Sequence, residues 1–297
     1  MKLALAGDTM LGRGVAARLA QDPHHTLVAP ELVDVIREAD LFLLNLECCI
    51  SARGEPWPGR VFHFRAPPWA AQILAQLGVD CVTLANNHAL DFGPNALFDT
   101  LAHLDAAGIA VVGAGTDLER ARAPVVIDGL TIVGFTDHPA EYAAGPQRPG
   151  VAFGPPDSLP QADPLLVLPH WGPNMTTEPR RSVRRAAHAL LQAGATIVGG
   201  HSAHVFHGVS PRVLYDLGDF IDDYAVDQRL RNDLGLLFVV DLAGDRLEAI
   251  PLKLEFAHTR LATDGDAAWI RRRFTAACAA FGTAVAEEKG RLVCRWR

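Results

Sequence analysis

The chain has 297 residues, of which 49% are hydrophobic, so it is long enough to bury a large core as one or two domains. Its formal net charge is −7 and its basic residues are dispersed, which excludes the concentrated basic patch that nucleic-acid binding needs. No apolar run approaches the roughly eighteen residues of a membrane-spanning helix, so no membrane association is expected.

In the first half of the chain, short apolar runs alternate with helical patterns. Strands are predicted at 3–6, 41–46, 80–85 and 109–112, and helices at 15–20, 31–38, 68–77 and 95–107. The continuous apolar run from Leu41 to Leu46 indicates burial on both faces of the sheet. Residues 51–68 form a polar, Pro/Gly-rich loop with Arg60, His63 and Arg65, which we expect to be solvated more than to line a cleft.

The second half begins with a hairpin signal, Asp128-Gly129 between the runs 125–127 and 131–135. Residues 137–163, rich in proline and glycine, are predicted to form a long loop that acts as a lid or wall of the site. Strands are then expected at 165–168, 196–198, 213–215, 235–242, 246–256 and 291–296, and helices at 179–193 and 267–281. Without a repeat or a linker, the chain is expected to be a single domain, with residues 243–297 as a strand–helix extension.

Arginines cluster twice, within 180–185 and at 271–273, at helical spacing typical of solvated helix faces. The five cysteines have no regular spacing, and the adjacent Cys48 and Cys49 do not favour a mutual bridge. We therefore expect structural thiols and a cytoplasmic location. No signal peptide is expected, because the short apolar run at the N-terminus ends at once in Gly7-Asp8.

Polar residues that can bind metals follow five of the predicted strands. Each lies in or beside a turn that contains glycine or proline, and the set comprises Asp8, Glu47, Asn87 with His88, His170, and His201 with His204. The carboxyl ends of parallel strands form the edge where open α/β sheets build their sites. One Gly-Asp turn or one buried histidine is more often structural, but the whole set favours a metal site.

The oxygen and nitrogen donors in this set suit Mn²⁺, Fe²⁺ or Zn²⁺ better than Ca²⁺, which prefers oxygen alone. A structural zinc site would more often contain cysteine. A carboxylate can bridge two cations, and paired metals about 3.5–4 Å apart stabilise both the attacking and the leaving oxygen in hydrolysis.

Six segments resemble the CapA family, the poly-γ-glutamate capsule synthesis proteins, which are a branch of the calcineurin-like metallophosphoesterases. The resemblance covers residues 3 to about 241 and is carried by 7–13, 45–47, 85–93, 113–115, 170–172 and 200–205. It implies an α/β fold, a four-layer α/β/β/α sandwich around a dinuclear metal centre.

The resemblance also implies a role for each site residue. Asp8 and His204 would bind one metal, Glu47 would bridge, and the second metal would be bound by Asn87, His170 and His201. His88 would be the general acid, oriented by Asp91.

Three features depart from the family pattern. Met10 occupies the histidine position of the superfamily's Asp-x-His motif, so one metal would have fewer ligands. Two residues separate His201 from His204, where the family motif has one. Capsule-forming members are usually membrane-anchored, and no anchor is evident here.

We therefore expect a metal-dependent hydrolase with two Mn, Fe or Zn ions per chain and a small anionic substrate. In this reading a water activated by the metals attacks a phosphoester, and His88 protonates the leaving group while Asp91 favours its charged form. The candidate substrate contacts are Arg13, Asn86 and Arg65, although a salt bridge closing the first turn explains Arg13 equally well.

Two alternatives remain open at this point. The same metals could hydrolyse a γ-glutamyl or amide-type substrate. Alternatively, the chain could be a non-catalytic accessory protein of poly-γ-glutamate synthesis with a closed structural metal site. The sequence leaves the oligomeric state open.

Overall fold

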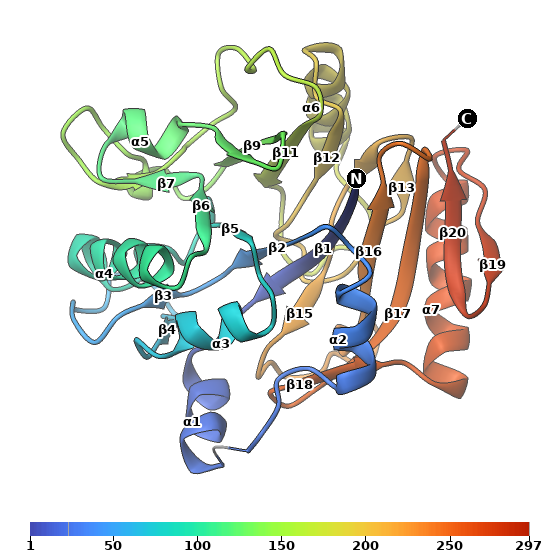
Figure 1. The fold of residues 1–297 in the computed structure, drawn as a ribbon, viewed down its shortest axis with the longest axis horizontal. Helices are drawn as coiled ribbons and strands as arrows, with labels where there is room; N and C mark the ends of the chain where they lie inside the picture. Colours follow the sequence, from blue (N-terminus) through green and yellow to red (C-terminus); the bar gives the residue numbers. More distant parts are fainter. Residues whose placement is uncertain (23, 297) are drawn as a thin grey trace.

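The computed structural model describes residues 1–22 and 24–296. Two β-sheets pack face to face, and helices cover the outer face of each (Figure 1). This is the predicted four-layer α/β/β/α sandwich, so the expected fold is confirmed.

The first sheet has the order β19-β20-β17-β16-β1-β2-β5-β6, with β15 paired to β1 and β18 to β17. Its N-terminal strands are β1 (Lys2–Thr9), β2 (Leu41–Leu46), β5 (Cys81–Thr83) and β6 (Ala110–Val112), which pair in parallel. The later strands are β15 (Asp219–Ile221), β16 (Leu234–Asp241), β17 (Arg246–Glu255), β18 (His258–Leu261), β19 (Ala286–Glu288) and β20 (Arg291–Arg295).

The second sheet has the order β13-β14-β12-β11-β9-β8. Its strands are β8 (Val125–Ile127), β9 (Leu130–Thr136), β11 (Leu165–His170), β12 (Ile197–Gly199), β13 (Val209–Ser210) and β14 (Val213–Leu214). The predicted Asp128-Gly129 hairpin is confirmed, since β8 and β9 pair antiparallel and both turn residues have positive φ. Two short pairs lie outside the sheets: β3 (Cys49–Ile50) with β4 (Arg65–Ala66), and β7 (Ala114–Gly115) with β10 (Gly150–Val151).

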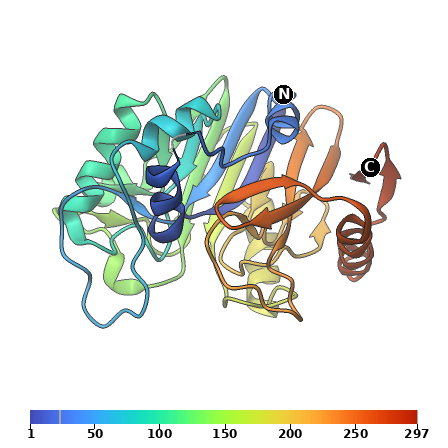
Figure 2. The same cartoon turned by 90° about the horizontal axis from the view of Figure 1, so that it is seen from below.

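Period-two alternation along β1 divides the core. Leu3 and Leu5 face the space between the sheets, whereas Ala4 and Ala6 face the helices outside. On that outer face lie α1 (Arg13–Gln21), α2 (Pro30–Ile36), α3 (Ala70–Gln76) and α4 (Gly93–Ala106) (Figure 2). The second sheet is covered by α5 (Leu118–Arg122) and α6 (Arg181–Gln192).

The C-terminal segment belongs to the same core. Helix α7 (Asp264–Ala279) places Ile270, Phe274 and Cys278 among the residues between the sheets. The ring of Phe274 lies 6.1 Å from that of Phe238 on β16 and 6.3 Å from that of Phe206. Residues 243–296 therefore extend the first sheet and close one end of the sandwich. Among the described residues, no helix combines the length and the apolar character needed to cross a bilayer.

Candidate metal centre

Three side chains meet at one level of the first sheet. Asp8 is the register partner of Asn45 on β2 and of Asp219 on β15. Gly7 makes this possible, because a Cβ at that position would lie 1.8 Å from the carbonyl oxygen of Gly218. The β1 and β15 backbones therefore approach closely, and the two carboxylates come together.

The second sheet brings its histidines to the same place. His170 is the last residue of β11, and its backbone forms an isolated parallel β-bridge with that of His201, which follows β12. The Nδ1 atom of His201 lies 3.3 Å from Asp8 Oδ1. The Nδ1 atom of His204 lies 2.8 Å from Asp219 Oδ1, 3.3 Å from Asp8 Oδ2 and 3.8 Å from Glu47 Oε2. One ligand atom from each of Asp8, His204 and Asp219 lies within 4.8 Å of the others, as a metal site requires.

Buried polar atoms without partners are concentrated in this cluster. Such an atom costs stability unless something binds it. Those in the cluster are Asp8 Oδ2, both carboxylate oxygens of Glu47, Asn87 Oδ1, Nδ1 of His170 and His201, and Asp219 Oδ2. They are the lone-pair atoms that a cation would bind, so the residues present fit a divalent metal site.

The electrostatics of the cluster agree with this fit. Burial and the charge of Asp8 raise the pKa of Glu47 well above its usual range, and burial raises the pKa of Asp219 to about 6. Burial opposes the charged form of His204, but the carboxylates of Asp219 and Glu47 raise its pKa well above the ordinary value. The carboxylates thus need positive charge, which divalent cations would supply.

Asn87 and His204 are the least buried of the candidate ligands. Asp8, Glu47 and His201 are at most 1% exposed, whereas Asn87 is 8% exposed and the His204 side chain 11%. The cluster is therefore largely buried, and the small exposed areas among its candidate ligands belong to Asn87 and His204.

Asn86 does not have the substrate-contacting role predicted for it. Its amide nitrogen donates to Asn45 Oδ1 (2.9 Å) and to the Leu46 carbonyl (2.8 Å), and its Oδ1 accepts from the backbone of His88 (2.9 Å). Asn45 in turn donates to Asp8 Oδ1 at 2.8 Å. Asn86 is fully buried and orients Asp8 through this amide chain, so it has no free donor for a substrate.

His88 and Asp91 form the predicted pair. His88 Nδ1 lies 2.6 Å from Asp91 Oδ2, and the ring of Phe64 stacks on the imidazole at 4.0 Å. Asp91 also accepts from the backbone of Phe64 (2.7 Å) and from the Tyr142 hydroxyl (2.9 Å). These contacts fix the ring of His88 and leave its Nε2 as the atom free for other partners.

The expected charge balance at His88 differs from the prediction. Burial lowers the pKa of His88, and the hydrogen bond to Asp91 opposes that shift without reversing it. The carboxylate therefore orients the ring and favours its charged form, as the sequence argument assumed, but burial outweighs this effect and the pKa of His88 stays below its ordinary value.

The two arginines that were predicted to contact the substrate, Arg13 and Arg65, lie in different surroundings. Arg13 forms a salt bridge with Asp223, in a distant loop and not within its own turn, and lies 4.9 Å above the ring of Phe64. Arg65 packs at 4.0 Å over the ring of Phe92 and donates to carbonyls of residues 53 and 54. Of these two arginines, only Arg13 contacts Phe64, the ring that stacks on His88.

Three site residues were not predicted. Asp219 follows Leu217-Gly218 and so repeats the apolar–Gly–Asp pattern of Asp8, a signal that could have found it. The Tyr224 ring lies 5.5 Å from that of His204, and its buried hydroxyl has no partner. Arg60 places Nε 3.5 Å from Asp91 Oδ1, so it is part of the site and not a solvated loop residue.

The loop that carries His201 and His204 is held in an unusual conformation. Ser202 has φ 118° and His204 has φ 58°, which non-glycine residues adopt at a cost. The buried Asp216 stabilises this loop, because Oδ2 accepts from the backbone of Ala203 and Oδ1 from that of Gly218. One carboxylate thereby positions the histidine loop and the start of β15 together.

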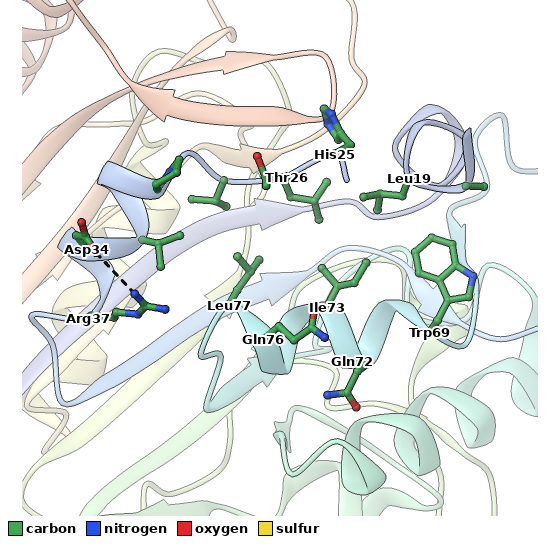
Figure 3. Close-up of a pocket in the computed structure, with 15 residues that line it drawn as sticks. Leu19, His25, Thr26, Asp34, Arg37, Trp69, Gln72, Ile73, Gln76 and Leu77 are labelled. Atoms are coloured by element: carbon green, nitrogen blue, oxygen red, sulfur yellow. Dashed lines mark ion pairs between the residues drawn. The ribbon is translucent and has the colours of Figure 1, made fainter. Parts of the chain in front are cut away.

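A separate pocket lies away from this cluster. It has a volume of about 770 Å³ and is lined by α1, the segment before α2, α2 itself and α3, including Leu19, Leu27 and Trp69 (Figure 3). None of the metal-site side chains lines it, so its size gives no reason to place the chemistry there.

The comparison with known families agrees with the geometry. A family described as bacterial capsule synthesis protein PGA_cap matches residues 2–224. The chain belongs to this family. PGA_cap proteins belong to the metallophosphoesterase superfamily, so the resemblance to the CapA family is confirmed.

Relatives of this PGA_cap chain carry names related to polymer synthesis. A probable polyglutamine synthesis accessory protein of Mycobacterium tuberculosis is 30% identical over 95% of this chain and 92% of its own length. The PGA biosynthesis protein CapA of Bacillus subtilis is 26% identical, over 75% and 63%. The capsule biosynthesis protein CapA of Bacillus anthracis is 25% identical, over 86% and 68%.

The departure of this PGA_cap chain at Met10 has a structural counterpart. Met10 is 1% exposed, packs in the core beneath the helices, and accepts a hydrogen bond from Gly12 at its sulfur. It therefore faces away from the cluster. Asp219 lies beside Asp8 and His204 instead and brings an additional donor to that part of the site.

Proposed function

We propose that this PGA_cap protein is a metal-dependent hydrolase with two divalent transition-metal ions, most simply Mn²⁺, Fe²⁺ or Zn²⁺. Asp8, His204 and Asp219 would bind one ion, Asn87, His170 and His201 the other, and Glu47 would bridge them. The observation that carries this proposal is the set of buried, unpartnered ligand atoms from separate strand ends. When bound, such ions supply Lewis-acid stabilisation and a nucleophile that is active at neutral pH.

Side chains beside the metal site would transfer the proton and stabilise developing charge. Asp91 and Phe64 hold the imidazole of His88, so that Nε2 delivers a proton to the leaving oxygen. Tyr224, whose ring lies 5.5 Å from that of His204, has a buried hydroxyl without a protein partner. Burial, followed by the charge of Glu47, raises the pKa of Tyr224 well above its ordinary value. The phenol therefore stays protonated and can donate a hydrogen bond to negative charge that develops on the substrate.

The reaction class that we favour is phosphoester hydrolysis, because the donor set corresponds to that of the metallophosphoesterase superfamily. A γ-glutamyl or amide-type substrate is the second candidate, and the names of the Bacillus and Mycobacterium relatives favour it. Those names equally suggest an accessory role in poly-γ-glutamate synthesis. The residual exposure of Asn87 (8%) and of the His204 side chain (11%) supports an open coordination position more than a closed structural site.

The test is a substrate screen with matched metal analysis. Purified protein is loaded with Mn²⁺ or Zn²⁺, its metal content is measured, and it is assayed on phosphoesters and on γ-glutamyl peptides. We expect about two ions per chain and turnover of at least one phosphoester. Full metal content without turnover in either panel would instead support the accessory role.

A further inference from the structure

A row of stacked rings runs from His88 to the surface of the protein. The ring of Phe64 stacks on the imidazole of His88 at 4.0 Å and 25°, and the ring of Phe62 stacks on that of Phe64 at 6.5 Å and 27°. Phe64 is 4% exposed, whereas Phe62 is 60% exposed. Two ring contacts therefore connect His88 with a solvent-facing aromatic ring that lies within roughly 10 Å of it.

The guanidinium group of Arg13 lies against the same rings. Its central carbon is 4.9 Å from the centroid of Phe64, 5.9 Å from that of Phe62 and 5.6 Å from that of Tyr224. The carboxylate of Asp223 accepts hydrogen bonds from Nε and from Nη2 of Arg13, so the side chain is held in place. Arginine in this setting is a planar cation that stacks on aromatic groups.

A single exposed phenylalanine is ordinary and needs no ligand to explain it. The loop that carries Phe62 is different, because other large side chains of this loop turn inward. The Trp57 ring lies 5.0 Å from that of Tyr142, and the Arg60 guanidinium lies 5.0 Å from the same ring. Val61 and Phe62, in contrast, project from the loop at 86% and 60% exposure. Packing within the protein therefore does not account for the position of the Phe62 ring.

A second exposed ring lies beside the start of α1. Phe256, in the turn between β17 and β18, is 61% exposed, and a Cβ on Gly14 would lie 2.7 Å from its Cζ atom. Three phenylalanines are exposed among the described residues, and the third, Phe98, lies on α4. Two of the three therefore lie beside residues 13 and 14, although they come from segments far apart in the sequence.

We propose that Phe62 and Arg13 form a subsite for a planar aromatic ring in the leaving group of the substrate. The flat ring stacks on the exposed face of Phe62 beside the guanidinium of Arg13, while the leaving oxygen meets Nε2 of His88. A separation of roughly 10 Å fits a ring that is joined to this oxygen through about two to four atoms. Aryl groups and nucleobases both present such a face. The proposal rests on the proposed function for the position of the reacting phosphoryl group.

The experiment compares leaving groups that differ in the shape of the ring. The full-length protein, loaded with Mn²⁺, is assayed on phenethyl phosphate and on cyclohexylethyl phosphate, whose leaving alcohols have similar acidity and apolar size. A parallel arm compares adenosine monophosphate with ribose phosphate and so distinguishes a nucleoside from a simple aryl group. Binding is measured separately from turnover, by calorimetry with the non-hydrolysable phenylpropyl phosphonate.

Three variants carry the test. Phe62→Leu keeps an apolar side chain but removes the ring, and Phe62→Tyr restores a ring. Phe98→Leu, at the exposed phenylalanine on α4, is the matched control. Because the two side chains are exposed, we expect metal content and thermal stability to be the same in all three variants as in the unmodified protein.

We expect the unmodified protein to prefer phenethyl phosphate to cyclohexylethyl phosphate by about threefold to tenfold in kcat/KM, mainly through KM. Phe62→Leu should lose this preference, whereas Phe62→Tyr and Phe98→Leu should keep it. Equal kcat/KM for the two esters in the unmodified protein, or a preference that survives in Phe62→Leu, overturns the proposal. A larger gain for adenosine monophosphate over ribose phosphate that depends on Phe62 assigns the ring to a nucleoside, and a larger gain for phenethyl phosphate assigns it to an aryl group.

The calorimetry separates this subsite from the proposed function. If no ester is hydrolysed but phenylpropyl phosphonate binds more weakly to Phe62→Leu than to Phe62→Tyr, the proposed function fails and the subsite stands. If the esters are hydrolysed at equal rates whatever the shape of the ring, the proposed function stands and the subsite fails.

Discussion

Asp8 and Asp219 are register partners across the parallel pairing of β1 and β15, although 211 positions separate them in the sequence. The Nδ1 atom of His204 lies close to both carboxylates, 3.3 Å from Asp8 Oδ2 and 2.8 Å from Asp219 Oδ1. This contact turns a cluster that lacks the motif histidine, replaced here by the buried Met10, into a site with enough donors for a metal.

The first prediction concerns Asp219. Asp219→Ala should lower the metal content from about two ions per chain to about one, because the second ion keeps its own ligands. Elemental analysis of the purified variant measures this. Asp241→Ala, at the far end of β16, is the control and should retain both ions. An Asp219→Ala protein with full metal content would remove Asp219 from the ligand set.

Substitution of Glu47 should lower the metal content more than substitution of Asp219. Both of its carboxylate oxygens are buried without a partner, as expected for a carboxylate that binds two ions. Glu47→Ala should therefore lose most of both metals, whereas Asp219→Ala loses one. The same elemental analysis compares the two variants, and equal losses in both would contradict a bridging Glu47.

His88 should affect turnover without affecting metal content. Its Nδ1 is bound to Asp91, and it follows Asn87, whose own oxygen is the unpartnered ligand atom. His88→Ala should keep its metals and lose about 10²–10⁴ in turnover on an alkyl phosphoester. The loss should be smallest on p-nitrophenyl esters, whose leaving group needs no proton. Equal losses on both esters exclude His88 as the general acid, and loss of metal makes it a ligand.

Tyr224→Phe tests the unpartnered phenol. The ring contacts with His204 and Phe64 remain in the variant, so metal content and thermal stability should be unchanged. Turnover should fall by up to about 10² if the hydroxyl stabilises developing charge, with little change in KM. Tyr215→Phe, whose ring packs on Phe281, is the control. Unchanged kcat in Tyr224→Phe would assign that hydroxyl no role in the reaction.

The cysteines should prove structural. All five are free and buried, and burial raises the pKa of Cys48 to about 12. Native protein should therefore react slowly with a thiol reagent such as DTNB. Five thiols per chain should react only after the protein is unfolded. Cys48→Ser with Cys49→Ser should cost about 1–3 kcal/mol per site in the free energy of unfolding, because the hydroxyl is more polar than the thiol. A fully stable but inactive double variant would contradict a structural role.

Local patterns in the sequence were sufficient for most elements. A few consecutive residues were enough to predict the continuous apolar strand β2 and the Asp128-Gly129 turn. The hydrophobicity of a strand and the residue types of a turn are local properties of the sequence. The strand-end residues Asp8, Glu47 and His170 were visible for the same reason, because each follows an apolar run directly. The family resemblance then supplied the four-layer arrangement.

Only the tertiary structure decided which polar groups are free and which are engaged. Asn86 lies next to Asn87 in the sequence, yet its amide is saturated by Asn45 and Leu46, whereas Asn87 Oδ1 is unpartnered. Asp219 reaches Asp8 only because β15 pairs with β1, two segments far apart in the chain. Hydrogen-bond saturation and charge pairing are set by these long-range contacts, which no local pattern encodes.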